Sequence, residues 1–148
     1  MKNSAEKYKN IILSLETLEQ RIELFDEYGN IFSVTSAKEN KKMLMATRDS
    51  MIWRFKFCTD LFWKTLKLYL EDTEKIEVSI NSPPGIIREA TKAKVISEDE
   101  GDVCMEMIEC RNKTSHAYHE LMAEEIATQI PGFYNLMKSI ADRIQSNH

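Results

Sequence analysis

The chain has 148 residues, which suits a single domain with a buried core of its own. Hydrophobic residues make up 43% and charged residues 30%, and the four glycines and three prolines are few, so long regular elements are favoured over loops or disorder. The formal net charge of −4 argues against a broad basic face that coats nucleic acid, but it allows a small local cationic site. We therefore expect one all-α domain covering residues 1–148.

Hydrophobic periodicity predicts helices along most of the chain. A first helix is expected from about Ser4, as its cap, to Asp26, where Tyr28-Gly29-Asn30 would end it. The β-branched stretch from Ile31 to Ser36 is interpreted as a connector. The longest pattern, Lys38 to Asp72, contains no glycine or proline and predicts a helix of roughly 50 Å.

Shorter elements follow this long helix. Asn81 to Gly85 is a clear break, and a short helix is expected from Gly85 to Lys94. Acidic residues from Glu98 to Asp102 indicate a linker or a helix start, followed by another short helix toward Arg111. A last long helix is expected from about Ser115 to Gln145. The predicted architecture is an up-and-down four-helix bundle with a short accessory helix.

The Lys38 to Asp72 helix carries two apolar stripes on a helical wheel. One stripe contains Ile52, Phe55, Thr59, Phe62, Leu66 and Leu70, and the nearly opposite one contains Trp53, Phe57, Leu61 and Leu68. A surface helix of a monomeric bundle needs only one stripe, so the second implies another buried contact. Two interpretations carry equal weight on this pattern: a central helix enclosed by its own domain, or a dimer interface.

The cysteines and the chain start indicate the compartment. The three cysteines are odd in number, lie among apolar neighbours and show no C-x-x-C spacing, which is typical of reduced packing residues in a cytosolic protein and argues against zinc. The first nine residues are polar, and no apolar run approaches the roughly eighteen residues that a membrane span requires. We expect a cytoplasmic protein without a membrane segment.

The run from Arg111 to Tyr118 is the part best suited to chemistry. Arg111 supplies a fixed cation, His116 an imidazole that titrates near neutral pH, and Tyr118 a phenol, which together suit work on a phosphate ester. In one continuous helix Arg111 would face the apolar stripe, which is costly for a guanidinium. We expect either a break at Asn112 to Ser115 that caps the last helix, or a water-filled cleft at a subunit boundary. Either would make a pocket, with Asn112 and Ser115 supporting the site.

An RNA strand carries its own nucleophile, the 2′-hydroxyl, so its cleavage needs a proton acceptor, a proton donor and positive charge, and no metal. His116 could act as base or acid, and Arg111 could bind the phosphate. A symmetric dimer would bring two copies of this histidine together. Each residue alone has an ordinary structural role, such as an arginine that bonds the last carbonyls of a helix. His116, His119 and Glu120 give only a weak metal-site signal, so we expect no metal and no cofactor.

The spacing of arginine, four residues, histidine, one residue and tyrosine resembles the signature of the HEPN family (higher eukaryotes and prokaryotes nucleotide-binding), and most of all its subgroup of nucleotidyltransferase substrate-binding proteins. Phe62 to Leu70 looks like the second helix of that subgroup, and Ser82-Pro83 followed by Arg88 to Ala90 looks like its next segment. The chain departs from the family near Gly101 to Met105, where a tryptophan is usual.

The resemblance implies an up-and-down bundle, usually a homodimer, that works with a separate minimal nucleotidyltransferase. In related pairs the bundle protein is a toxin that cleaves RNA, and the transferase is an antitoxin that attaches a nucleotide to the motif tyrosine, here Tyr118. An older view gives the bundle a passive role in presenting substrate to the transferase.

The chain lacks a Gly-Ser pair followed by closely spaced carboxylates, so it is not expected to be a nucleotidyltransferase itself. Three other functions stay open. It could be a metal-independent ribonuclease that uses Arg111 and His116, or a non-catalytic subunit that binds nucleotide or substrate. The third hypothesis is a helical adaptor in which the polar residues from Arg111 to Tyr118 only cap the junction between two helices.

Overall fold

A computed structural model of the chain describes residues 2–147, with side chains from residue 5 onward. The elements in chain order are α1 (Lys2–Thr35), α2 (Lys38–Asp72), α3 (Pro83–Lys92), α4 (Glu98–Lys113), the 3-10 turn η1 (Thr114–His116) and α5 (Glu120–Asn147). No strand occurs among these residues, so the predicted all-α bundle of four main helices and one accessory helix is confirmed.

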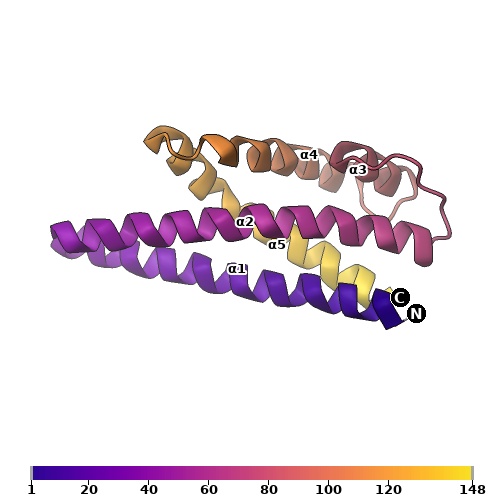
Figure 1. The fold of residues 1–148 in the computed structure, drawn as a ribbon, viewed down its shortest axis with the longest axis horizontal. Helices are drawn as coiled ribbons and strands as arrows, with labels where there is room; N and C mark the ends of the chain where they lie inside the picture. Colours follow the sequence, from indigo (N-terminus) through magenta and orange to yellow (C-terminus); the bar gives the residue numbers. More distant parts are fainter. Residues whose placement is uncertain (1, 148) are drawn as a thin grey trace.

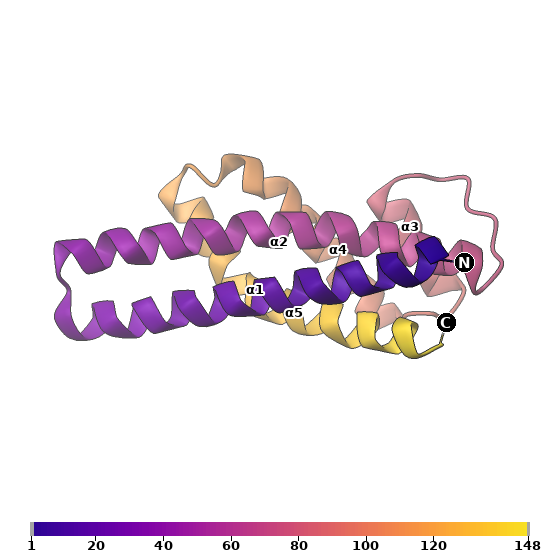
Figure 2. The same ribbon diagram turned by 60° about the horizontal axis from the view of Figure 1, so that its bottom comes forward.

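The two longest helices, α1 and α2, form an antiparallel hairpin (Figure 1). On one side of it α3 and α4 pack against α2, and α5 crosses the bundle in contact with α1, α2 and α4. The turn of the hairpin projects beyond the other helices (Figure 2). The other helices therefore cover one part of the α1–α2 hairpin, and the part next to its turn extends beyond them.

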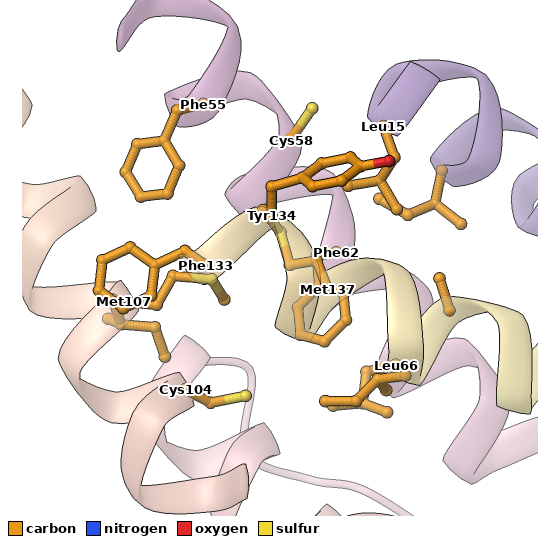
Figure 3. Close-up of a cluster of buried hydrophobic side chains, with 14 of the residues drawn as sticks. Leu15, Phe55, Cys58, Phe62, Leu66, Cys104, Met107, Phe133, Tyr134 and Met137 are labelled. Carbon is orange, nitrogen blue, oxygen red and sulfur yellow. The ribbon is translucent and has the colours of Figure 1, made fainter. Parts of the chain in front are cut away.

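The core lies between α1, α2, α4 and α5 (Figure 3), and buried residues of α3 extend it. The rings of Phe55 and Phe133 stack with centroids 5.8 Å apart, and Phe62, Leu66 and Met137 are buried beside them. The apolar stripe of α2 that contains Phe55 and Phe62 thus faces the core as predicted. None of the helices within residues 2–147 has the length and hydropathy of a membrane-spanning segment.

All three cysteines are free and buried in this core. Burial raises the pKa of the Cys58 and Cys110 thiols to about 11 and that of the Cys104 thiol to about 12. The Cys58 sulfur also lies 2.8 Å from the hydroxyl of Ser14 on α1. The interpretation of the cysteines as packing residues is confirmed.

The side chains of Ser82 and Ser97 cap the N-termini of α3 and α4. Ser82 caps α3 by accepting a hydrogen bond from the Gly85 amide, and prolines occupy the first two positions of the helix. Ser97 and Glu100 form a reciprocal capping box at α4, and Glu100 also accepts two hydrogen bonds from Arg143 on α5. The acidic segment from Glu98 to Asp102 is therefore the start of a helix and not a linker.

The predicted boundaries of the first helix were wrong at both ends. α1 is already helical before Ser4, and it continues through Tyr28-Gly29-Asn30 and the expected connector to Thr35. An internal glycine costs a helix only about 1 kcal/mol, and packing along α2 outweighs this because Gly29 faces the side chain of Leu44. The chain turns instead at Ser36, which has a φ of 49°.

The second apolar stripe of α2 is only partly covered by its own domain. Leu61 and Leu68 are half-buried against the core. Trp53 and Phe57 remain 60% and 47% exposed, and their rings stack with centroids 6.2 Å apart. One end of the stripe thus belongs to the bundle, and the other end forms an exposed aromatic surface.

Candidate functional site

Arg111 lies in the last turn of α4, where an aspartate on α2 holds its guanidinium. Its Nε and Nη2 atoms donate to Asp60 Oδ1 and Oδ2 at 2.7 and 2.9 Å. This hydrogen-bonded pair raises the pKa of Arg111, so the group stays charged at any physiological pH. The side chain is 25% exposed, so its charge is compensated without being sealed from solvent. The cost of placing an arginine near the core is met by Asp60, a partner that sequence reasoning missed.

A hollow of about 350 Å³ opens beside this pair. The residues that line this Arg111 hollow come from α2, α3 and α4: Thr59, Asp60, Trp63, Lys64, Pro83, Ile108, Arg111 and Asn112. Two cations and one carboxylate give it a net positive lining. The Thr59 hydroxyl is buried and has no hydrogen-bond partner among the described residues. The hollow therefore combines a fixed cation, a lysine and an indole ring.

The polar residues after Arg111 end α4. The Thr114 hydroxyl donates to the Arg111 carbonyl at 2.6 Å, and the Ser115 hydroxyl donates to the Asn112 carbonyl at 3.1 Å. These bonds satisfy carbonyls that a helix end leaves free. The break expected at Asn112 to Ser115 lies later in the chain: α4 continues through Lys113, and the break covers residues 114–119. The last helix starts at Glu120 and not at Ser115, so neither Asn112 nor Ser115 caps it.

His116 and Tyr118 project from the segment between α4 and α5. Both are exposed, Tyr118 by 76%, and their ring centroids lie 6.3 Å apart. Tyr118 also packs against His119, with centroids 4.3 Å apart. The structure thus places Arg111 and Asn112 in one hollow, whereas His116 lies outside that hollow on η1 and Ser115 is exposed next to it.

A second hollow of about 280 Å³ adjoins Tyr118. Its lining comes from α2 and from η1 and the turn after it: Asp49, Ile52, Trp53, Lys56, Thr114, Ala117 and Tyr118. We call it the Tyr118 hollow. Its α2 residues lie on the turns that precede those of the Arg111 hollow, so the two hollows follow each other along α2.

A buried arginine anchors the C-terminal end of the motif segment, by which we mean residues 114–119 between α4 and α5. Arg48 is 3% exposed, and its guanidinium donates to both carboxylate oxygens of Glu120 at 2.8 and 3.1 Å and to Asp49 at 3.2 Å. The pair raises the pKa of Arg48 and lowers that of Glu120. The first residue of α5 is thereby tied to α2, so residues 114–119 are held at both ends. Within the described residues no cluster of three or more His, Cys, Asp or Glu side chains could hold a metal ion.

The fold and these hollows define an all-α bundle with a cationic site at the junction of α4 and the motif segment. Residues 6–146 match the family model described as nucleotidyltransferase substrate binding protein like, so the chain belongs to that family. It is also similar to the crystal structure of a protein from Thermus thermophilus, with a TM-score of 0.72 and 27% sequence identity over 90% of this chain and 98% of that one. No curated protein matches the chain.

Proposed function

We propose that the chain is a HEPN-type protein and the ribonuclease toxin of a pair whose antitoxin is a separate minimal nucleotidyltransferase, both acting in the cytoplasm. The observation that carries this proposal is the Arg111 hollow. Asp60 fixes the guanidinium by accepting from two of its N–H groups, and the further N–H donors of the planar group are left for a phosphate. Lys64 adds a second cation in the same hollow. Membership of the family supports a nucleotidyltransferase as the partner.

The chemistry that follows is a transesterification within the RNA strand. The 2′-hydroxyl attacks the adjacent phosphorus and gives its proton to His116, and the bond from phosphorus to the 5′-oxygen breaks. Arg111 stabilises the negative charge that develops on the phosphorane. The leaving 5′-oxygen takes a proton from an acid, and the products carry a 2′,3′-cyclic phosphate and a 5′-hydroxyl. This sequence of steps uses no metal ion.

The same steps support a homodimer, because one chain supplies one motif histidine and the reaction needs both an acid and a base. His116 of the partner subunit would be the second group. An exposed apolar surface that contains Phe57 and Leu13 lies on α1 and α2, with the Arg54 guanidinium 5.3 Å from the Phe57 ring. We propose that a second copy covers the surface around Phe57 and Leu13 and leaves Trp53 exposed, so that the dimer interpretation of the α2 stripe applies to Phe57 and not to Trp53.

A second candidate function is a non-catalytic subunit that binds nucleotide or substrate for the transferase. The observation that favours it is the pairing of Arg111 with Asp60. The Asp60 carboxylate already accepts from Nε and Nη2 of Arg111, and these are a pair of donors that a phosphate would otherwise bind. In either function the exposed Tyr118 is the proposed site of nucleotidylation. A nucleotide there would add negative charge and bulk two residues from His116 and so oppose phosphate binding.

Incubation of the purified chain with single-stranded RNA in excess chelator separates the two candidates. The ribonuclease predicts cleavage that persists in chelator and leaves 2′,3′-cyclic phosphate ends. Intact RNA, together with a stable complex between the chain and a nucleotidyltransferase, would refute the ribonuclease and support the binding subunit. Intact RNA without any such complex would contradict both.

A further inference from the structure

The Tyr118 hollow has features of a binding site that the cleavage chemistry does not use. An indole ring, a phenol, a lysine and a carboxylate line it, and its volume of about 280 Å³ is just below the range for small-molecule sites, roughly 300–1,000 Å³. It can therefore hold one small ligand. Because Trp53 is 60% exposed, its ring is open to a ligand from solvent.

The indole is held in place by its neighbours on α2. The Phe57 ring lies nearly parallel to it, with an interplanar angle of 14°, and the Arg54 guanidinium lies 5.5 Å from the indole centroid. Neither Arg54 nor Phe57 lines the Tyr118 hollow. A fixed, solvent-open aromatic face is the feature on which proteins stack nucleobases, whatever the base.

The charged residues of the hollow lie on either side of this ring along the helix. Asp49 is one turn before Trp53 and Lys56 is about one turn after it, so the two charges are separated by roughly 10 Å along the axis. A carboxylate accepts hydrogen bonds from amino or hydroxyl groups, and an ammonium binds an anion. In order along α2 the hollow thus offers an acceptor, a flat ring and a cation.

An ion pair with Arg48 reduces the repulsion between the Asp49 carboxylate and an anion bound in the hollow. The buried guanidinium of Arg48 donates to Asp49 Oδ1 from Nε and Nη2, both at 3.2 Å, and compensates part of its charge, because the same guanidinium also binds the Glu120 carboxylate. Lys56 lines the hollow, and no ion pair of Lys56 occurs within the described part of the chain. The cation that remains for a ligand is therefore Lys56.

We infer that the Tyr118 hollow binds one nucleotide unit, with its base against Trp53 and its phosphate at Lys56. Since the Arg111 hollow follows along the same face of α2, the unit is a nucleotide of the RNA strand next to the cleaved phosphate, or a free nucleoside monophosphate of the same chemistry. The inference rests on the proposed function for its RNA source. As a base subsite it would position the strand without taking part in proton transfer.

Calorimetric titrations of the full chain with AMP, adenosine and a short RNA test the subsite. We expect AMP to bind, and Trp53→Ala and Lys56→Gln each to weaken AMP binding at least about tenfold. Adenosine should bind more weakly than AMP to the native chain and be insensitive to Lys56→Gln. The matched control is Lys42→Gln, an exposed lysine of α2 outside both hollows, which should leave AMP binding unchanged. Thermal melts establish that each variant is folded.

The variant Arg111→Ala separates this subsite from the neighbouring one. AMP binding that persists in Arg111→Ala and falls in Trp53→Ala supports the inference. AMP binding that is lost in Arg111→Ala but kept in Trp53→Ala would overturn it, as would a native chain that binds neither AMP nor RNA. A matching loss of RNA affinity in Trp53→Ala identifies the strand as the source of the nucleotide, and a loss confined to AMP identifies the free nucleotide.

Cleavage assays run in parallel keep the two proposals distinct. A chain that cleaves RNA and shows no effect of Trp53→Ala on nucleotide binding refutes the subsite alone. A chain that binds AMP through Trp53 but leaves RNA intact refutes the ribonuclease alone.

Discussion

Replacing Asp60 with alanine should weaken the bundle and test whether Arg111 has a role beyond structure. The Asp60–Arg111 pair joins α2 to α4 through two short hydrogen bonds, and its side chains are 36% and 25% exposed. Exposed ion pairs contribute about 0–1 kcal/mol, whereas breaking a buried pair costs about 3–5 kcal/mol. At this intermediate exposure we expect Asp60→Ala to lower the free energy of unfolding by about 1–2 kcal/mol.

A double-mutant cycle of Asp60→Ala and Arg111→Ala, followed by urea denaturation, measures the coupling directly. At roughly 2–4 °C per kcal/mol for a chain of this size, each single variant should also lower Tm by about 2–8 °C. The coupling should shrink as salt is raised, because the pair is partly open to solvent. A coupling below about 0.3 kcal/mol would show that the two residues act independently and would refute the structural part of the reasoning.

The same variants distinguish a role of Arg111 in binding phosphate from its role in joining α2 to α4. If Arg111 also binds phosphate, Arg111→Ala should abolish RNA cleavage at a temperature where both variants are folded, whereas Asp60→Ala should retain part of it because the guanidinium remains. Equal activity in the two folded variants would mean that Arg111 serves only to join α2 and α4.

Three further outcomes follow from the described contacts. The three buried cysteines, with pKa values of about 11 to 12, should react with a thiol reagent only as fast as the chain unfolds, and rapid labelling of the native protein would contradict their placement. Burial opposes ionisation of Glu100, but its hydrogen bonds lower its pKa overall. Its carboxylate should therefore stabilise the fold above about pH 4.5, and that contribution should disappear as the pH falls through the lowered pKa. Accordingly, Glu100→Gln should lower Tm at pH 7 but lose its effect in acid, and a difference from native that is constant with pH, or an equal effect of Glu98→Gln, would argue against this. Finally, Glu120→Gln should speed amide hydrogen exchange in residues 114–119 by weakening the tie to Arg48, whereas exchange as slow as in the control Glu124→Gln would show that the tie does not hold this segment.

The sequence predicted the helices whose patterns are uninterrupted. Lys38 to Asp72 was predicted with its observed ends, because no glycine or proline interrupts its apolar periodicity. The start of α3 was signalled by Ser82 followed by proline, although the helix begins at Pro83, two residues before the predicted start. The end of α1 was missed because local turn preference at Gly29 is weaker than the packing of α1 against α2, which the pattern of one helix does not reveal.

For the candidate site, the sequence identified Arg111 and the break that follows it but not the groups that hold them. Asp60 lies 51 positions from Arg111, and Arg48 lies 72 positions from Glu120, so no local spacing connects either pair. An arginine at a core-facing position of a helix, such as Arg48, is a signal that a buried partner exists, but it does not say which residue that is. The roles of His116 and Tyr118 stay predictions.

The central claim is that His116 acts on the phosphate of an RNA strand bound at Arg111. The most direct measurement is the rate of RNA cleavage, in chelator, by His116→Ala beside the matched variant His119→Ala, which removes an exposed histidine from the same segment. The account predicts a loss of at least about a hundredfold in the first variant, the lower range for general acid–base catalysis, and a near-native rate in the second. Equal rates in the two variants, with native oligomeric state and Tm, would contradict it.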